Sequence, residues 1–106
     1  MYNKNVMMYL NSININDSII DSDQIKYGVN DGYSCVDIYI GERVSFRVFG
    51  DAYITAMTKW LAESIHNKIN IKDTDLVQLV EKFEIPKYKI RNAVQILEVI
   101  EKINER

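Results

Sequence analysis

The clearest pattern in the chain is the alternation of apolar with other residues in two short segments on either side of Gly41. A period of two is typical of a strand with one buried face, and a glycine between two such segments favours a tight connection. The sequence therefore predicts a β-hairpin. Its inward-facing positions are Val36, Ile38 and Ile40 in one strand and Val44, Phe46 and Val48 in the other.

The length of the hairpin loop follows from the register that each choice imposes. A two-residue loop of Gly41 and Glu42 sets Ile40 opposite Arg43, which mixes apolar and polar side chains on each face of the sheet. A three-residue loop keeps the apolar residues on one face. We therefore expect a loop of residues 41–43, which pairs Ile40 with Val44, Ile38 with Phe46, Val36 with Val48 and Asp37 with Arg47.

Weaker patterns precede the hairpin. Residues 6–10 carry apolar side chains on one side of a short opening helix, which the Asn-rich stretch 11–17 ends. Residues 25–29 form a first strand, which we place at an edge of the sheet, and the turn-forming residues 30–32 close it.

Helical spacing dominates the second half of the chain. A helix of about four turns follows Asp51, and a short second helix is capped by Asp73 or Thr74. Pro86 suits the first turn of a last helix, which runs to Lys102 and beyond. The apolar positions of the three helices are Ile54, Met57, Leu61 and Ile65, then Leu76, Leu79, Val80 and Phe83, then Ile90, Ala93, Val94, Leu97, Ile100 and Ile103.

The order of these elements is one helix, three strands and three helices. Such an order favours an antiparallel sheet with the helices packed on one face. We expect an α+β fold with a three-stranded antiparallel sheet, in one domain that spans residues 1–106. A length of 106 residues with 47% apolar content is enough for one core.

Charge and cysteine content narrow the function. The net charge is -2 and neither sign forms a long block, so we expect no binding to nucleic acid or to a membrane surface. Cys35 is the sole cysteine, which excludes an intramolecular disulfide and suits a reducing compartment. Because we also find neither a signal-peptide core nor a membrane span, we expect a cytoplasmic protein.

Several segments together resemble the NifU/IscU family of iron-sulfur scaffolds. Residues 49–51, Phe-Gly-Asp, follow a hairpin and precede an amphipathic helix, where the family has an aromatic-Gly-Cys-Gly turn. Residues 71–76 are similar to the family's segment before its penultimate helix, and residues 83–92 to its Leu-Pro-Pro-Val-Lys-Ile-His-Cys stretch. Residues 5–12 resemble its opening helix, so the likeness covers about residues 3–103.

The resemblance also locates what this chain lacks. Family members hold a 2Fe-2S cluster or zinc with three cysteines and an aspartate, and accept sulfur from a cysteine desulfurase. By the resemblance, the three cysteine positions fall on Gly32, Asp51 and Asn92, and the aspartate position falls on Ser34. Iron-sulfur clusters need thiolate donors, which these residues do not supply. We therefore expect no bound cofactor.

Individual residues near these positions have plain structural interpretations as well. Asp51 is expected to cap the following helix, and His66 to lie in solvent at the end of that helix. Cys35 is expected to be a small strand residue packed under a helix. Arg91 and Asn92 either close the former site by bonding to Asp51, or leave Arg91 in solvent. A metal site would require Cys35, Asp51 and His66 to converge, and we expect no such site.

Two classes of function remain. The chain has no catalytic motif and one histidine, so we expect no enzymatic activity. The resemblance implies a scaffold-like protein that cannot hold a cluster and that acts as partner or regulator of a cysteine desulfurase. The alternative is a protein–protein interaction domain unrelated to sulfur metabolism, which uses some of the chain's seven tyrosines at its interface.

Overall fold

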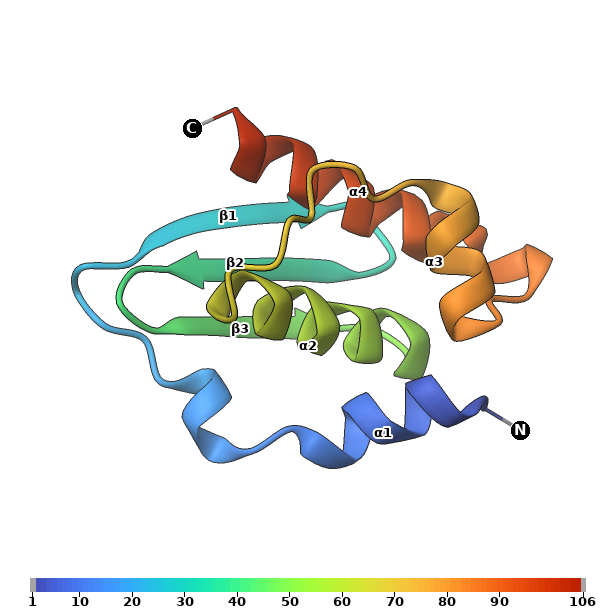
Figure 1. The fold of residues 1–106 in the computed structure, drawn as a ribbon, viewed down its shortest axis with the longest axis horizontal. Helices are drawn as coiled ribbons and strands as arrows, with labels where there is room; N and C mark the ends of the chain where they lie inside the picture. The colour runs from blue at the N-terminus through green and yellow to red at the C-terminus, as the bar shows by residue number, and fades with distance from the viewer. Residues whose placement is uncertain (1, 106) are drawn as a thin grey trace.

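The computed structural model describes residues 2–105 and has the expected α+β architecture (Figure 1). Three antiparallel strands form one sheet in the order β1-β2-β3. The elements in chain order are α1 (Lys4–Ser12), the 3₁₀ turn η1 (Ile15–Ser18), β1 (Ile25–Asn30), β2 (Cys35–Ile40), β3 (Val44–Phe49), α2 (Ala52–His66), α3 (Leu76–Phe83), the 3₁₀ turn η2 (Lys87–Lys89) and α4 (Ile90–Asn104).

The hairpin has the predicted three-residue loop. Ile40 pairs with Val44 and Asp37 pairs with Arg47, and the Gly41 N–H donates to the Arg43 carbonyl across the loop. Strand β1 pairs with β2 and forms an edge of the sheet, as expected. The register therefore followed from the requirement that the apolar residues share one face.

The turn between β1 and β2 is held by side chains. The Asn30 Oδ1 accepts from the Gly32 N–H at 2.9 Å, and the Asp31 Oδ1 accepts from the N–H groups of Tyr33 and Ser34 at the same distance. Gly32 has a φ of +88°, a conformation that side chains with a Cβ rarely adopt. The sequence Asn-Asp-Gly thus matches the backbone that this turn needs.

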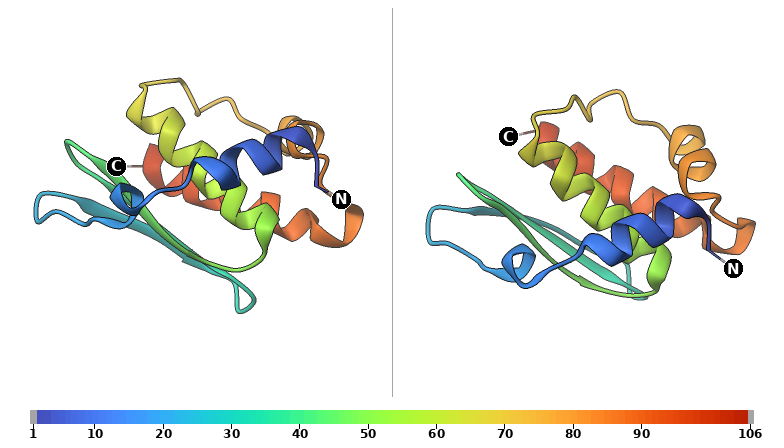
Figure 2. Two further views of the ribbon diagram at one scale, coloured as in Figure 1. Left: turned by 90° about the horizontal axis from the view of Figure 1, so that it is seen from below. Right: turned by 60° about the horizontal axis from the view of Figure 1, so that its bottom comes forward.

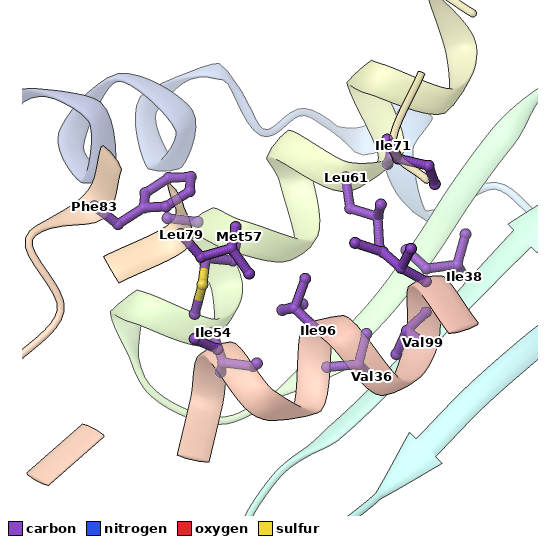
Figure 3. Packing of buried hydrophobic residues seen from close by; sticks show 14 of the residues in the cluster. Val36, Ile38, Ile54, Met57, Leu61, Ile71, Leu79, Phe83, Ile96 and Val99 are labelled. Carbon is purple, nitrogen blue, oxygen red and sulfur yellow. The ribbon is translucent and has the colours of Figure 1, made fainter. Parts of the chain in front are cut away.

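All the long helices lie to one side of the sheet, as both views in Figure 2 show. Helix α2 packs on β3, and α4 packs on β1 and β2. Between them, the inward residues Val36 and Ile38 of β2 meet Met57 and Leu61 of α2 and Ile96 of α4 (Figure 3). This apolar layer is the core that fixes the position of both helices on the sheet.

Polar caps join the ends of the helices to one another. The Asn3 side chain caps α1 by accepting from the Val6 N–H, and the amides of Asn3 and Asn5 both donate to the Lys82 carbonyl at the end of α3. At the β1 edge of the sheet, the Lys102 ammonium of α4 donates to the Gly28 carbonyl at 2.7 Å. These bonds satisfy carbonyl groups that have no partner within their own helix or strand pair.

Two details of the predicted helices are wrong. Helix α3 is capped by Asp75, because the Asp75 and Gln78 side chains bond each other's backbone N–H groups in a capping box. On α4, Val94 is 40% exposed, whereas Ile96 and Val99 are fully buried. The buried face of α4 includes the polar residues Asn92 and Gln95. Val94 therefore lies outside the buried face.

Within residues 2–105, no helix combines the length and the apolar character needed to cross a membrane.

Ile38→Ala should destabilise the protein by about 2–5 kcal/mol, because it leaves a cavity in the fully buried layer between sheet and helices. Ile25→Ala is the matched control, because Ile25 lies in a strand and is 60% exposed. Urea unfolding followed by circular dichroism measures both. Equal stability losses in the two variants would contradict the arrangement of the core.

Candidate functional site

Asp51 lies between the end of β3 and the start of α2, and its backbone is extended. Its Oδ1 accepts from the Ile54 N–H at 3.0 Å, which caps the first turn of α2 as predicted. Gly50 precedes it in a tight position, because a Cβ there would lie 2.9 Å from the Ser34 Cβ and 2.5 Å from the Ile54 Cγ2. The Phe-Gly-Asp sequence therefore fits a close turn from strand to helix.

The Asp51 carboxylate also binds two side chains from the start of the last helix. The Asn92 amide donates to both carboxylate oxygens at 3.0 Å, and the Lys89 ammonium lies 2.6 Å from Oδ2. Asn92 is only 3% exposed, so its amide has little access to water. We call Asp51, Lys89 and Asn92 the Asp51 cluster.

The cluster shifts the titration of its charged members. Burial favours the neutral acid, but hydrogen bonds from Lys89, the Ile54 N–H and Asn92 outweigh it and lower the pKa of Asp51 below its ordinary value. The hydrogen bond to Asp51, aided by its negative charge, raises the pKa of Lys89. The pair is therefore ionised across the physiological range.

Ser34 is buried beside the cluster and is bonded to Gln95 of α4. The Ser34 hydroxyl donates to the Gln95 Oε1, and the Gln95 Nε2 donates to the carbonyls of Val29 and Ser34 at 2.9 Å. All polar atoms of the Gln95 amide are thus bonded, to Val29 of β1 and to Ser34 of the following turn. Ser34 ties α4 to the sheet through this contact.

A surface hollow of about 400 Å³ brings together three of the four positions that the resemblance singled out. Ser34, Asp51 and Asn92 line it, and Gly32 does not. A Cβ added to Gly32 would have no other atom within 4 Å. This position therefore lies open beside the hollow. Sequence reasoning therefore identified positions from the β1–β2 turn, the N-cap of α2 and α4 that share one hollow, and Gly32 adjoins it through Tyr33.

Of the two expected places of Arg91, the structure has the second, because Arg91 is exposed to solvent. Its guanidinium carbon lies 3.8 Å from the centroid of the Tyr33 ring, and it makes no bond to Asp51 among residues 2–105. Such cation–π stacking is weak at an exposed position. Lys89, which sequence reasoning did not single out, supplies the cation instead, and its place one turn before Asn92 was the available signal.

The metal site built from Cys35, Asp51 and His66 does not form. Asp51 and His66 lie at opposite ends of α2, about 22 Å apart at 1.5 Å per residue. In the part of the chain that the structure describes, no three His, Cys, Asp or Glu side chains gather closely enough to hold a metal ion. His66 is exposed at the helix end, as expected.

The expected position of Cys35 under a helix is wrong. Val36 and Ile38 of β2 enter the core, so the alternation of the strand turns Cys35 toward the face of the sheet that carries no helix. Cys35 is half-buried there, opposite Asn30 and Phe49. It is a small strand residue outside the core.

Exposed aromatic residues surround the Asp51 cluster. Phe49 and Tyr88 are each 77% exposed, and Tyr33 is 70% exposed. Tyr2 and Tyr53 pack edge to face with ring centroids 5.0 Å apart, in a second hollow that Asp51, Tyr88 and Lys89 also line. We call Tyr2, Tyr33, Phe49, Tyr53 and Tyr88 the aromatic rim.

The Asp51 cluster lacks the groups of a nucleophilic site and of a thiolate metal site. A carboxylate, an amide and an ammonium that bond one another supply neither a nucleophile with an adjacent base nor thiolate ligands. Aromatic side chains around a satisfied polar centre are typical of protein interfaces.

No protein-family model matches this chain, and no curated protein matches it either. The resemblance to the NifU/IscU scaffolds therefore rests on the order and spacing of the chain's own motifs, and it stays a prediction.

The Asp51 cluster predicts a pH dependence of stability. Asp51→Ala should cost about 1–2 kcal/mol at pH 7, because it removes the cap of α2. Asp51→Asn should cost less, because an amide oxygen still caps the helix while the charge that pairs with Lys89 is lost. Since the folded pKa is lowered, this charge stabilises the protein fully above the unfolded pKa of about 3.9.

The advantage of the parent over Asp51→Asn should therefore shrink as the pH falls below about 4 and through the lowered folded pKa. Denaturant unfolding at several pH values measures it. Glu98→Gln, an exposed acid-to-amide change on α4, is the control and should show no such difference. A gap between parent and Asp51→Asn that stays constant from pH 7 to pH 2 would contradict the ion pair.

Proposed function

We propose that this chain is a scaffold-like protein of iron-sulfur cluster assembly that does not itself hold a cluster, and that it acts as a partner or regulator of a cysteine desulfurase. The observation that carries the proposal is the Asp51 cluster. Positions that correspond by resemblance to cluster ligands face one hollow, and two of them, Asp51 and Asn92, bond each other instead of a metal.

The donor set at these positions does not fit an iron-sulfur cluster. Glycine offers no side chain, and Ser34, Asp51 and Asn92 offer oxygen or amide groups in place of thiolates. Ser34 and Asn92 are moreover engaged by Gln95 and Asp51. We therefore assign the hollow a structural role and no sulfur or metal chemistry.

The aromatic rim supports the binding part of the proposal. Phe49 and Tyr88 are large and exposed, and residues of this type provide much of the binding energy at protein interfaces. They lie around the surface that the resemblance relates to sulfur transfer in the family. A desulfurase that docks there would cover a site with no sulfur acceptor, which suits regulation rather than assembly.

The same rim favours a second candidate, a protein–protein interaction domain unrelated to sulfur metabolism. Its exposed aromatic side chains suit many protein partners, and the Asp51 cluster stabilises the surface whichever partner binds. The two candidates differ in one respect, which is affinity for a cysteine desulfurase.

The purified protein should bind the cysteine desulfurase of its own organism without raising the turnover of the enzyme, because the surface is present while the sulfur acceptors are missing. Phe49→Ala and Tyr88→Ala should each weaken binding about tenfold, the loss typical of an aromatic anchor. Isothermal titration calorimetry measures the affinity, and a sulfide assay measures turnover.

Ile25→Ala is the control, because Ile25 is exposed at the other end of β1 from the turn that carries Tyr33. It should bind like the parent. Absence of binding by the parent protein would reject the desulfurase proposal in favour of the second candidate.

A rebuilt ligand set tests the resemblance itself. Gly32→Cys, Ser34→Asp, Asp51→Cys and Asn92→Cys together should create a zinc site, because three thiolates and a carboxylate suit tetrahedral zinc. Open space around Gly32 accommodates the new side chain, although its positive φ strains any residue with a Cβ. Zinc at a thousandfold excess over Kd should stabilise the variant by about 4 kcal/mol.

The measurement is the melting temperature with zinc and with a chelator, together with zinc content per chain. The parent should respond to neither. If the variant folds but binds no stoichiometric zinc and shows no chelator-sensitive shift, the four positions do not converge and the resemblance is misaligned.

A further inference from the structure

A third hollow, of about 460 Å³, lies between the start of α3 and the last turns of α4, two helices that pack against each other. Its apolar lining consists of Leu76 of α3 and of Leu97 and Ile100 of α4. Leu76 and Leu97 are only half-buried. We call this hollow the α3–α4 groove, and its remaining lining residues are Lys72, Thr74, Asp75, Glu101, Asn104 and Glu105.

Apolar side chains also remain exposed on both helices of the groove. Val94 precedes Leu97 by about one helical turn and is 40% exposed, and Val77 follows Leu76 and is 62% exposed. An exposed valine gains little from folding, whereas its burial by a partner removes apolar surface from water. Within residues 2–105, nothing covers this apolar surface.

The groove carries an excess of negative charge. Its lining has three carboxylates, those of Asp75, Glu101 and Glu105, and one ammonium, that of Lys72, which gives a net charge of -2. Glu98 adds another exposed carboxylate one turn after Val94. The ion pairs within residues 2–105 involve none of these side chains, because they join Lys26 to Asp37, Arg43 to Asp21, Lys59 to Asp17 and Lys89 to Asp51.

We propose that the α3–α4 groove binds a basic amphipathic helix of a partner protein. Apolar residues at positions i, i+4 and i+7 of that helix pack against Leu76, Val94 and Leu97, and lysine or arginine residues beside the apolar stripe pair with the acids that border the groove. From Val94 to Glu105, α4 extends about 16 Å at 1.5 Å per residue, which matches about three turns of a bound helix.

A second copy of this chain is a poor occupant. A dimer that uses the same face of both copies brings the two acidic grooves together, and like charges across an interface oppose binding. The groove shares no residue with the Asp51 cluster or with the aromatic rim, so this proposal does not depend on the proposed function.

The test titrates the ¹⁵N-labelled parent protein, at constant ionic strength, with an alanine-based peptide of about 14 residues. The peptide has leucines at positions i, i+4 and i+7 and lysines on both flanks of the leucine stripe. It should give saturable amide shifts in residues 74–77 and 94–105. A peptide with glutamate in place of lysine should give none, and neither should a peptide of the same composition with the leucines spread around the helix.

Two variants test the two parts of the recognition. Glu101→Gln should raise the Kd about threefold, the effect of one exposed ion pair, and Val94→Ala should raise it about fivefold, because two methyl groups leave the interface. Both residues are exposed, so the fold should persist. The matched controls are Glu42→Gln in the hairpin loop and Met8→Ala on α1, because both residues are exposed and neither lines the groove.

The proposal is overturned if the basic peptide gives no saturable shifts in these residues, or if the acidic or rearranged peptide shifts them equally. It is also overturned if the control variants weaken binding as much as the groove variants do. Sedimentation equilibrium on the parent alone tests the second copy, and a dimer that Val94→Ala dissociates would assign the groove to self-association and reject the proposal. None of these variants touches the aromatic rim or the Asp51 cluster, so failure here leaves the desulfurase test unaffected.

Discussion

The Asp51 carboxylate connects three parts of the molecule. It follows β3, caps the first turn of α2 through the Ile54 N–H, and accepts hydrogen bonds from Asn92 and Lys89 at the start of α4. Helices α2 and α4 form the layer that covers the sheet, and this one side chain joins the first turns of both. The apolar core packs the helices on the sheet, and Asp51 links their ends.

The same bonds determine the ionisation state of Asp51. A carboxylate that is satisfied by a helix N–H, an amide and an ammonium is stabilised in its charged form and has no spare capacity for proton transfer. To free it, the Ile54 N–H, Asn92 and Lys89 would all have to move, and Asn92 is buried. The most exposed large groups near it are the rings of Phe49, Tyr88 and Tyr33.

Much of this fold could be predicted because alternation and helical spacing are strong signals. The hairpin register followed from keeping Val36, Ile38 and Ile40 on one face, and the cap of α2 from an acid directly before an apolar helix. The face of α4 was less predictable, because Asn92 and Gln95 are buried through bonds to Asp51 and to the β1–β2 turn. Nothing local in the sequence marks those partners, which lie 41 to 66 residues away.

Lys89 and Lys59 were missed for the same reason. Each looks like a surface lysine in the sequence, and each acquires its role from an aspartate brought close by tertiary structure.

The two edges of the sheet limit how another chain can approach. At β1, the Lys102 ammonium occupies the carbonyl of Gly28. At β3, the segment with η1 lies alongside, and the Ser45 hydroxyl bonds the Ile19 carbonyl. The Lys102 bond engages one carbonyl of the six-residue edge strand β1, which makes this edge a poorer template for an added strand. At the β3 edge, a partner would meet η1 and side chains before it met the backbone of the strand.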